Sequence, residues 1–175
     1  MHQSTVFLTT TLVVLAGPAG AAMTLASPDI RPNGPIATAQ IYPRCGGQNI
    51  SPQLSWSGAP AGARSLVLTM IDLDVKPALW SHWIVVDLPP ASSGLPRGVK
   101  QLPGGAAAVT GNFGDAAYDG PCPPGGTGVH RYQFTIWAMP AAKTVIAPDA
   151  KASDIAPRLA RSALGQASLT GWVKR

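Results

Sequence analysis

Glycine and proline interrupt this chain so often that long helices have little room. The 175 residues include 19 glycines and 18 prolines, whereas only 12% of the residues are charged. Glycine and proline favour turns over helix interiors, and a solvent-facing helix needs many charged side chains. We therefore expect a mainly β fold with many turns. The length is that of one ordinary domain.

Three β-prone runs predict the strands of the core. Residues 65–71 are mostly apolar, which is typical of a central strand with both faces covered. Residues 82–88 form a second run, which ends at Pro89 and Pro90 because proline nitrogens cannot donate to a strand ladder. Residues 131–139 alternate instead, and one face of that strand carries Tyr132, Phe134, Ile136 and Ala138.

The remaining elements are expected to be short. The pattern predicts an extended, poorly packed segment over residues 27–35, a first strand over 36–41, and mostly loop with one or two short strands over 91–129. A single helix is predicted near residues 153–164, with Ser153 or Asp154 as its cap and Gly165 at its end. A closing strand is expected over residues 167–173.

The first 21 residues are typical of a secretory signal peptide. They contain no Lys, Arg, Asp or Glu, residues 6–15 are largely apolar, and Ala19 and Ala21 place small side chains at a possible cleavage site. A buried helix or a membrane anchor is a weaker interpretation, because the apolar stretch is short and ends in Gly17-Pro18. We expect export to the periplasm or the medium, and no other segment is apolar enough to span a bilayer.

This prediction divides the chain into a signal peptide over residues 1–21, an extended segment over 22–35 and one domain over 36–175. The formal net charge of +5 comes from 13 basic and 8 acidic residues, which are spread without a basic run. A solvated basic surface is therefore favoured, and nucleic-acid binding is not expected.

Cys45 and Cys122 are the two cysteines of the sequence. In an oxidising compartment the pair predicts a disulfide, and two free thiols are the alternative. A metal site is less favoured, because neither cysteine belongs to a Cys-x-x-Cys pair.

Polar side chains stand at the ends of the predicted strands. Asp72 and Asp74 follow the first β-prone run, His82 opens the second, and His130 opens the third after a loop rich in glycine and proline. Histidines and a carboxylate at strand ends suggest one small polar pocket, in which ring N–H groups could donate to phosphate oxygens. The alternatives are an Asx-type turn for the acidic pair and structural roles for the histidines. Arg131 either adds a positive charge or faces solvent.

Other chemical signals are weak. Glycines 120, 125, 126 and 128 either turn amide N–H groups towards an anion or serve only as turn residues. Neither a phosphate-binding Gly-x-x-x-x-Gly-Lys-Ser/Thr loop nor a Gly-x-Ser-x-Gly elbow is present, so no nucleophile is marked. Trp80 and Trp83 flank His82 and are expected to line a pocket wall.

Several motifs together resemble the bacterial, Raf-kinase-inhibitor-like branch of the phosphatidylethanolamine-binding protein family. They are Gly46-Gly-Gln-Asn-Ile-Ser-Pro-Gln-Leu-Ser-Trp56, residues 68–74, His82-Trp-Ile-Val-Val86, Asn112-Phe-Gly114, residues 118–124, residues 128–132 and residues 167–172. These motifs run in the family's order over nearly all of the chain from about Ile36.

The resemblance implies a Greek-key, β-sandwich-like fold with a large antiparallel sheet and one or two short peripheral helices. It also implies a small pocket for phosphate-like groups, lined by Asp72, His82, His130 and Tyr132, with Gly120 and Pro121 on its rim. One departure concerns the rim, because Leu73 stands where the family commonly has a proline and Pro77 arrives one residue late. Proline restricts the backbone, so this departure bears on the pocket's rigidity.

We therefore expect an exported binding protein that holds a small anionic or phosphorylated ligand and performs no chemistry, with no cofactor and no metal. Asp72 would fix an imidazole tautomer or meet a ligand ammonium. The rival interpretation is a hydrolase-type enzyme in which Asp72 and His82 or His130 form an acid/base pair. The family name alone suggests a third, an inhibitor of a kinase or a protease.

Overall fold

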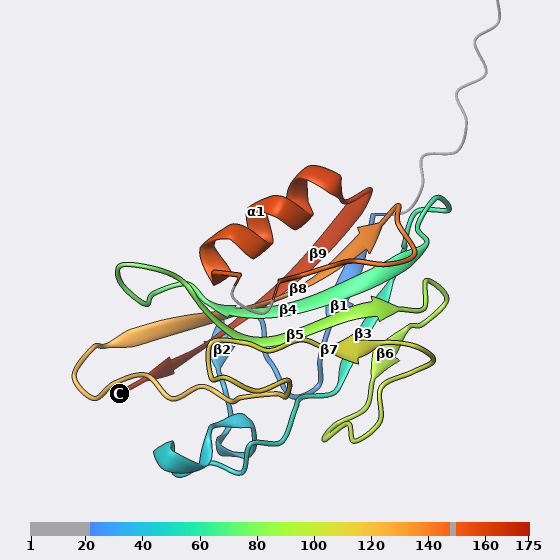
Figure 1. Ribbon diagram of the computed structural model, residues 1–175. Coiled ribbons are helices and arrows are strands. Elements are labelled where there is room, and N and C mark those ends of the chain that lie inside the picture. The colour runs from blue at the N-terminus through green and yellow to red at the C-terminus, as the bar shows by residue number, and fades with distance from the viewer. Residues whose placement is uncertain (1–21, 148–149) are drawn as a thin grey trace, which may run out of the picture.

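The computed structural model describes residues 22–147 and 150–175, which build two β-sheets and one α-helix (Figure 1). The predicted signal peptide lies outside these residues. The smaller sheet has the order β1-β3-β6, with β1 at Thr24–Ala26, β3 at Leu54–Ser57 and β6 at Gly94–Leu95. The mainly β fold predicted from turn composition is confirmed.

The larger sheet has the order β2-β9-β8-β4-β5-β7. Its strands are β2 (Gly34–Pro35), β4 (Ser65–Asp72), β5 (Trp80–Leu88), β7 (Ala107–Ala108), β8 (Val129–Met139) and β9 (Gly165–Lys174). Only β2 runs parallel to its neighbour, and the other pairs are antiparallel. The two short strands β6 and β7 occupy the stretch that was predicted to be mostly loop.

Strand β4 is buried along its whole length, as expected for a central strand with both faces covered. Leu66, Leu68 and Met70 belong to the main core, whereas Val67 on the opposite face packs into a second cluster with helix α1 (Ala152–Ser162). Figure 1 shows α1 lying across one face of the large sheet, with the small sheet on the other side. The alternation predicted for β8 is also present, because Tyr132, Phe134, Ile136 and Ala138 all enter the main core.

The first strand predicted over residues 36–41 is wrong. That segment contains a 3-10 helix, η1 (Thr38–Gln40), and a second one, η2 (Pro43–Cys45), follows it. Gln40 and Ile41 donate their N–H groups to carbonyls three residues earlier, so they cannot extend a sheet ladder. The strand that pairs with β9 lies just before, at β2.

The segment before β2 is not poorly packed, in contrast to the prediction. Ile30 is fully buried in the main core, and Asp29 forms an ion pair with Arg97. Gly171 on β9 makes this packing possible, because a Cβ there would lie 2.7 Å from Ile36 Cγ1 and 3.1 Å from Ile30 Cγ2. A segment predicted to be extended and poorly packed therefore joins the core, because Gly171 has no side chain in the space that Ile30 and Ile36 occupy.

Helix α1 begins and ends slightly earlier than predicted. Lys151 is its N-cap residue and provides no side-chain cap, so neither Ser153 nor Asp154 caps the helix. Ala152 at the helix start is buried, with 1% of the residue exposed. Gly165 does not end the helix, since it is the first residue of β9.

Candidate functional site

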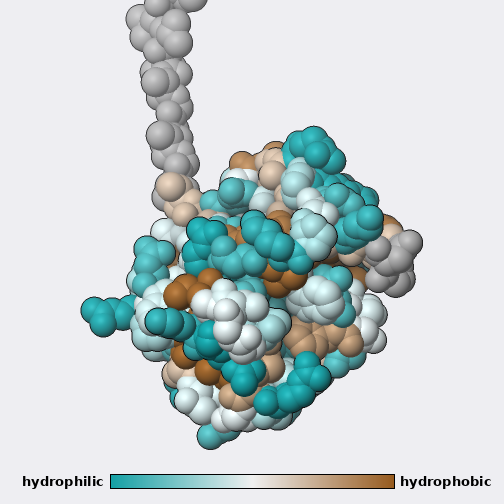
Figure 2. All heavy atoms as spheres, turned by 90° about the vertical axis from the view of Figure 1, so that its left-hand side faces the viewer, coloured by the Kyte–Doolittle hydropathy of each residue, from teal (hydrophilic) through white to brown (hydrophobic). Residues whose placement is uncertain are grey.

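A cavity of about 590 Å³ lies at the end of the large sheet where the β4–β5 loop meets the start of β8. Figure 2 shows this side of the molecule, where hydrophobic surface lies between hydrophilic side chains. The cavity is lined by Arg44, Asp72, Asp74, Val75, Lys76, Trp80, His82, Phe113, Cys122, Pro123, Pro124, Thr127, His130 and Tyr132. Four of these are the predicted polar residues Asp72, His82, His130 and Tyr132, which come from three adjacent strands.

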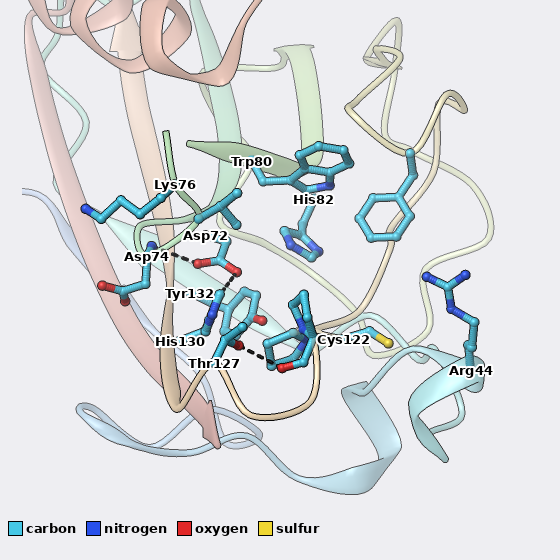
Figure 3. Close-up of a pocket in the computed structure, with 14 residues that line it drawn as sticks. Arg44, Asp72, Asp74, Lys76, Trp80, His82, Cys122, Thr127, His130 and Tyr132 are labelled. Atoms are coloured by element: carbon cyan, nitrogen blue, oxygen red, sulfur yellow. Dashed lines mark hydrogen bonds and ion pairs between the residues drawn. The ribbon is translucent and has the colours of Figure 1, made fainter. Parts of the chain in front are cut away.

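Asp72 and His130 form a buried pair in the cavity wall (Figure 3). Asp72 Oδ2 lies 2.8 Å from His130 Nδ1, and the two side chains are 3% and 6% exposed. Because a carboxylate accepts, His130 Nδ1 carries a proton and points Nε2 away from Asp72. Asp72 Oδ1 accepts the backbone N–H of Asp74 at 2.9 Å. Both carboxylate oxygens therefore have partners within the protein, which suits the orienting role expected for Asp72 better than contact with a ligand ammonium.

Tyr132 supplies a polar group without a partner. The residue is fully buried, and its hydroxyl makes no hydrogen bond to any residue that the structure describes. Burial raises the pKa of Tyr132, and the Asp72 carboxylate raises it further through its charge and its proximity to the hydroxyl, so the hydroxyl keeps its proton. The Asp72 oxygens are bonded to His130 and to the Asp74 N–H, and the hydroxyl makes no well-formed hydrogen bond to them. A buried hydroxyl without a partner is costly, so Tyr132 is a candidate donor to a ligand in this cavity.

His82 is held differently from His130. Its Nδ1 lies 2.7 Å from the backbone carbonyl of Asp119, and only 4% of the residue is exposed. Burial lowers the pKa of His82 to about 4, although the Asp119 carbonyl and the charge of Asp72 act in the opposite direction. The ring is therefore neutral at neutral pH, and its N–H is already used by the carbonyl. The N–H of His82 therefore faces the protein, although ring N–H groups of both histidines were expected to be able to donate to phosphate oxygens.

An acidic pair lies behind His82. Asp119 is buried and accepts from His82 through its carbonyl, while its own N–H donates to the His82 carbonyl at 3.0 Å. Burial raises the pKa of the Asp119 side chain to about 7, and the nearby Asp115 carboxyl raises it as well. The residue whose backbone holds His82 thus also carries a side chain that titrates near neutral pH.

Phe113 forms an aromatic wall with two residues of β5 and with Tyr42, which precedes η2. Its ring centroid lies 5.1 Å from His82, 5.3 Å from Tyr42 and 6.0 Å from Trp80. The neighbouring Asn112 fixes the loop, because its Oδ1 accepts both the N–H and the hydroxyl of Ser81 at 2.7 and 2.8 Å. Trp83, which was predicted to line the same wall, instead lies in the core against Tyr118.

Two exposed cations flank the cavity. Arg44 projects from η2 on one side and Lys76 from the β4–β5 loop on the other (Figure 3). The third basic residue, Arg131, is outside the lining and pairs with Asp74 through contacts of 2.8 and 2.9 Å. These bonds lower the pKa of Asp74 to about 2, so its charge is balanced locally. Of the two earlier alternatives for Arg131, the structure favours the solvent-facing one.

The disulfide between Cys45 and Cys122 is present, as predicted, and Cys122 itself lines the cavity. It joins η2, which carries Arg44, to the segment with Pro123 and Pro124. The guanidinium of Arg175 also reaches this point and donates to the Pro123 carbonyl at 3.3 Å. The cross-link therefore ties the segment that carries Arg44 to the segment that carries Pro123 and Pro124.

Gly120 and Pro121 are buried beside the cavity and do not line it. A Cβ on Gly120 would lie 2.1 Å from the Gln40 carbonyl oxygen, and the Gly120 N–H donates to Asn49 Oδ1 at 2.7 Å. Pro121 accepts from the Tyr42 N–H at 3.1 Å. These residues dock the segment behind His82 onto the η1–η2 region. The later glycines form a turn in which Thr127 donates back to the Pro124 carbonyl.

Leu73 stands where the family that this sequence resembles commonly has a proline. Unlike proline, it has a backbone N–H, and this N–H is hydrogen-bonded. Its N–H donates to the Arg131 carbonyl at 2.9 Å and adds a rung to the β4–β8 ladder beside Asp72. A backbone hydrogen bond thus holds the rim at the position where the family pattern would restrict the backbone with a proline ring.

Sequence reasoning missed several lining residues, above all Arg44, Lys76, Phe113 and Thr127. Phe113 stands in the Asn-Phe-Gly motif, which was a usable signal, whereas Arg44 and Lys76 carry no local mark. Within the described residues, no group of three or more His, Cys, Asp or Glu side chains is placed to hold a metal. No described helix combines the length and apolarity that crossing a membrane requires.

Comparison with known proteins gives one consistent family. A profile of the family described as phosphatidylethanolamine-binding protein matches residues 26–174. LppC, a candidate lipoprotein of Mycobacterium tuberculosis H37Rv, is 39% identical over 163 residues, which cover 93% of this chain and 78% of that protein. The UPF0098 protein YbcL of Escherichia coli K12 is 32% identical over 158 residues, or 86% of each chain.

Solved structures agree with this result. The crystal structure of Escherichia coli YbcL, described as a new member of the mammalian PEBP family, has a TM-score of 0.80 and 30% identity, and covers 89% of this chain and 99% of that chain. The structure of CT736 from Chlamydia trachomatis, described as a candidate homologue of the same family, has a TM-score of 0.72 and 32% identity over 88% of this chain and 98% of that chain. The fold class predicted from the motifs is confirmed.

Proposed function

Because the chain belongs to the phosphatidylethanolamine-binding protein family, we propose that it is an exported, non-catalytic binding protein whose cavity receives a phosphate-like group. The observation that carries this proposal is the buried Tyr132 hydroxyl, which has no partner among the described residues and lines the cavity. A buried donor without a partner is costly, and an oxyanion would satisfy it.

The charges around the cavity support an anionic ligand. Arg44 and Lys76 flank the mouth, whereas Asp72 is bonded to His130 and Asp74 is paired with Arg131. A guanidinium offers paired donors to phosphate oxygens, and an ammonium adds a mobile positive charge. The apolar lining from Trp80, Phe113 and the prolines favours a ligand whose anionic group is attached to an organic body.

Export is supported by two observations. Residues 1–21 have the composition of a signal peptide, and a relative at 39% identity is named as a candidate lipoprotein. Intact-mass measurement of protein from the native compartment tests this part. A mature chain that begins after Ala21 is expected, and a retained Met1 would contradict export by this signal.

The Asp72–His130 pair favours one second candidate, an enzyme with an acid/base pair. Catalysis by covalent attack would also need a nucleophile near His130. The Thr127 hydroxyl, which is the aliphatic hydroxyl of the lining, donates to the Pro124 carbonyl at 2.7 Å. We therefore place binding ahead of hydrolysis. Hydrolysis of phenyl phosphate that disappears in His130→Ala would reverse this order.

Calorimetric titration with O-phosphoethanolamine tests the binding proposal. Wild-type protein should bind it, and Arg44→Gln and Lys76→Gln should each weaken binding several-fold and reduce its dependence on salt. Lys100→Gln is the matched control, because Lys100 is an exposed lysine outside the lining. Absence of binding by wild-type protein, or equal losses in all three variants, would contradict a phosphate site at this cavity.

A further inference from the structure

The hydrogen bonding of His82 fixes which ring nitrogen carries the proton. The Asp119 carbonyl oxygen, 2.7 Å from Nδ1, can only accept, so Nδ1 is the protonated nitrogen. The ring cannot turn over easily, because Phe113 and Tyr132 pack against it with centroid distances of 5.1 Å each. The backbone of Asp119 is in turn bonded to that of His82.

The other nitrogen, Nε2, is therefore an acceptor. His82 lines the cavity (Figure 3), and Nδ1 is the ring nitrogen that bonds to the Asp119 carbonyl. The Gly120 backbone also lies close enough to the ring to raise its pKa. The titratable and charged groups around the ring are Asp72, His130 and Tyr132 on the neighbouring strands, Asp119 behind it, and Arg44 and Lys76 at the mouth. Burial lowers the pKa of His82 to about 4, so the ring stays in this neutral form well below pH 7.

An acceptor in an anion pocket has a chemical consequence. A fully deprotonated oxygen placed against the Nε2 lone pair would be repelled, whereas a P–OH group would donate to it. The remaining oxygens would meet the donors of Tyr132, Arg44 and Lys76. Phosphomonoesters have a second pKa of about 6 and therefore offer such a hydroxyl in their singly charged form. Sulfate monoesters have the same shape and charge but no proton to donate.

We propose that His82 makes the cavity selective for oxyanions that carry a proton, so that it takes singly protonated phosphomonoesters and rejects sulfate esters. This inference rests on the proposed function and names the ligand class of the same site. His82 thereby acts as a specificity-determining residue. Its Nδ1 is held by a backbone carbonyl, whereas Nδ1 of His130 is held by the Asp72 carboxylate.

The test compares O-phosphoethanolamine with ethanolamine O-sulfate at about pH 5.5, where the phosphate ester is mostly singly charged. The two probes then share charge, shape and ammonium group, and differ in one proton. Wild-type protein should bind the phosphate ester at least about tenfold more tightly, which is the range expected for one charge-assisted hydrogen bond. Equal affinities would overturn the selectivity proposal and leave the anion pocket intact. Failure of both probes to bind would overturn the proposed function together with it.

A variant and a spectroscopic measurement provide independent checks. His82→Gln replaces the acceptor by an amide that can also donate, so the preference for phosphate should fall to within about threefold. Nitrogen-15 NMR of the His82 imidazole is measured on wild-type protein, so it does not depend on whether the variant folds. It should show a protonated Nδ1 and an unprotonated Nε2 at His82 near pH 6.5. A protonated Nε2 at that pH would overturn the inference even if the variant failed to fold.

Discussion

Asp72 lies directly opposite Tyr132 across the β4–β8 ladder, yet its carboxylate accepts a hydrogen bond from His130, two residues earlier on β8. Tyr132 and His130 share one face of β8 because side chains alternate along a strand. The strand register therefore brings three polar groups into one wall. Of these three groups, the Tyr132 hydroxyl is the one without a hydrogen-bond partner among the described residues.

Two buried tyrosines should respond in opposite ways to loss of the hydroxyl. Tyr118 donates to the Gln40 carbonyl at 2.9 Å, so Tyr118→Phe should lower the free energy of unfolding by about 1–3 kcal/mol. Tyr132→Phe removes a hydroxyl without a partner, so stability should stay equal or rise. O-Phosphoethanolamine affinity should fall about tenfold in Tyr132→Phe only. Urea unfolding and calorimetry measure the two effects, and the reverse pattern would place the ligand elsewhere.

The Asp72–His130 pair should be energetically coupled. His130→Ala leaves a buried carboxylate without its ring donor and should lower the free energy of unfolding by about 3 kcal/mol. Adding Asp72→Asn should recover part of that loss, because the uncompensated charge disappears. Ligand affinity should stay at least about tenfold reduced in both proteins. Additive stability losses in the double-mutant cycle would show that the pair does not act as a unit.

Two buried groups oppose each other in the pH dependence of stability. The pKa of His82 is lowered from 6.5 to about 4, so its contribution is present above pH 6.5 and is lost as the pH falls towards 4. The pKa of Asp119 is raised from 3.8 to about 7, so its contribution is present below pH 3.8 and is lost as the pH rises towards 7. The two slopes have opposite signs between about pH 4 and 6.5 and partly cancel.

Removing either titrating group should leave the pH dependence of stability that is due to the other. In Asp119→Asn, the free energy of unfolding should rise with pH over this window, with a slope of up to about 1.4 kcal/mol per pH unit for one proton. In His82→Gln, it should fall with pH instead. Wild-type protein should have the flattest profile of the three. Urea unfolding at several pH values measures the slopes, and identical slopes in all three proteins would refute the assignment.

The disulfide should support both stability and ligand affinity. It closes a loop of 77 residues, so replacing both cysteines by serine should lower the free energy of unfolding by about 4 kcal/mol. Ligand affinity should also fall, because η2 with Arg44 is no longer tied to the wall at Pro123. Reductant should produce the same changes in wild-type protein and none in the variant. A reductant effect of equal size in the variant would mean that the cross-link is not the cause.

Leu73→Pro should test the departure from the family pattern. The substitution removes the N–H that bonds to the Arg131 carbonyl at 2.9 Å, so stability should fall by about 1 kcal/mol or more. Leu73→Ala keeps this N–H and is the matched control for the lost side chain. If the two variants were equally stable, the extra rung would contribute nothing.

The positions of the core strands along the chain were predictable from the sequence because their signals are local. The unbroken apolar run of β4, the alternation of β8 and the prolines after β5 each report on neighbouring residues only. Residues 36–41 misled the same reasoning, because the choice between strand and 3-10 helix there depended on distant partners. Ile36 packs against Gly171, and Gln40 receives the hydroxyl of Tyr118.

The residues of the candidate site also differ in whether local sequence or distant contacts determine their role. From the sequence, Asp72, His82 and His130 could be placed near strand ends and Tyr132 could be placed in a family motif, since residue type and position in a motif are local facts. Their hydrogen bonding depends on the folded chain, because a histidine takes its tautomer from whichever acceptor reaches its ring. Asp119 lies 37 residues from His82, and Asp72 lies 58 residues from His130. Arg44 and Phe113 became part of the cavity for the same reason, since the disulfide and the Asn112–Ser81 bonds bring distant loops to the end of the sheet.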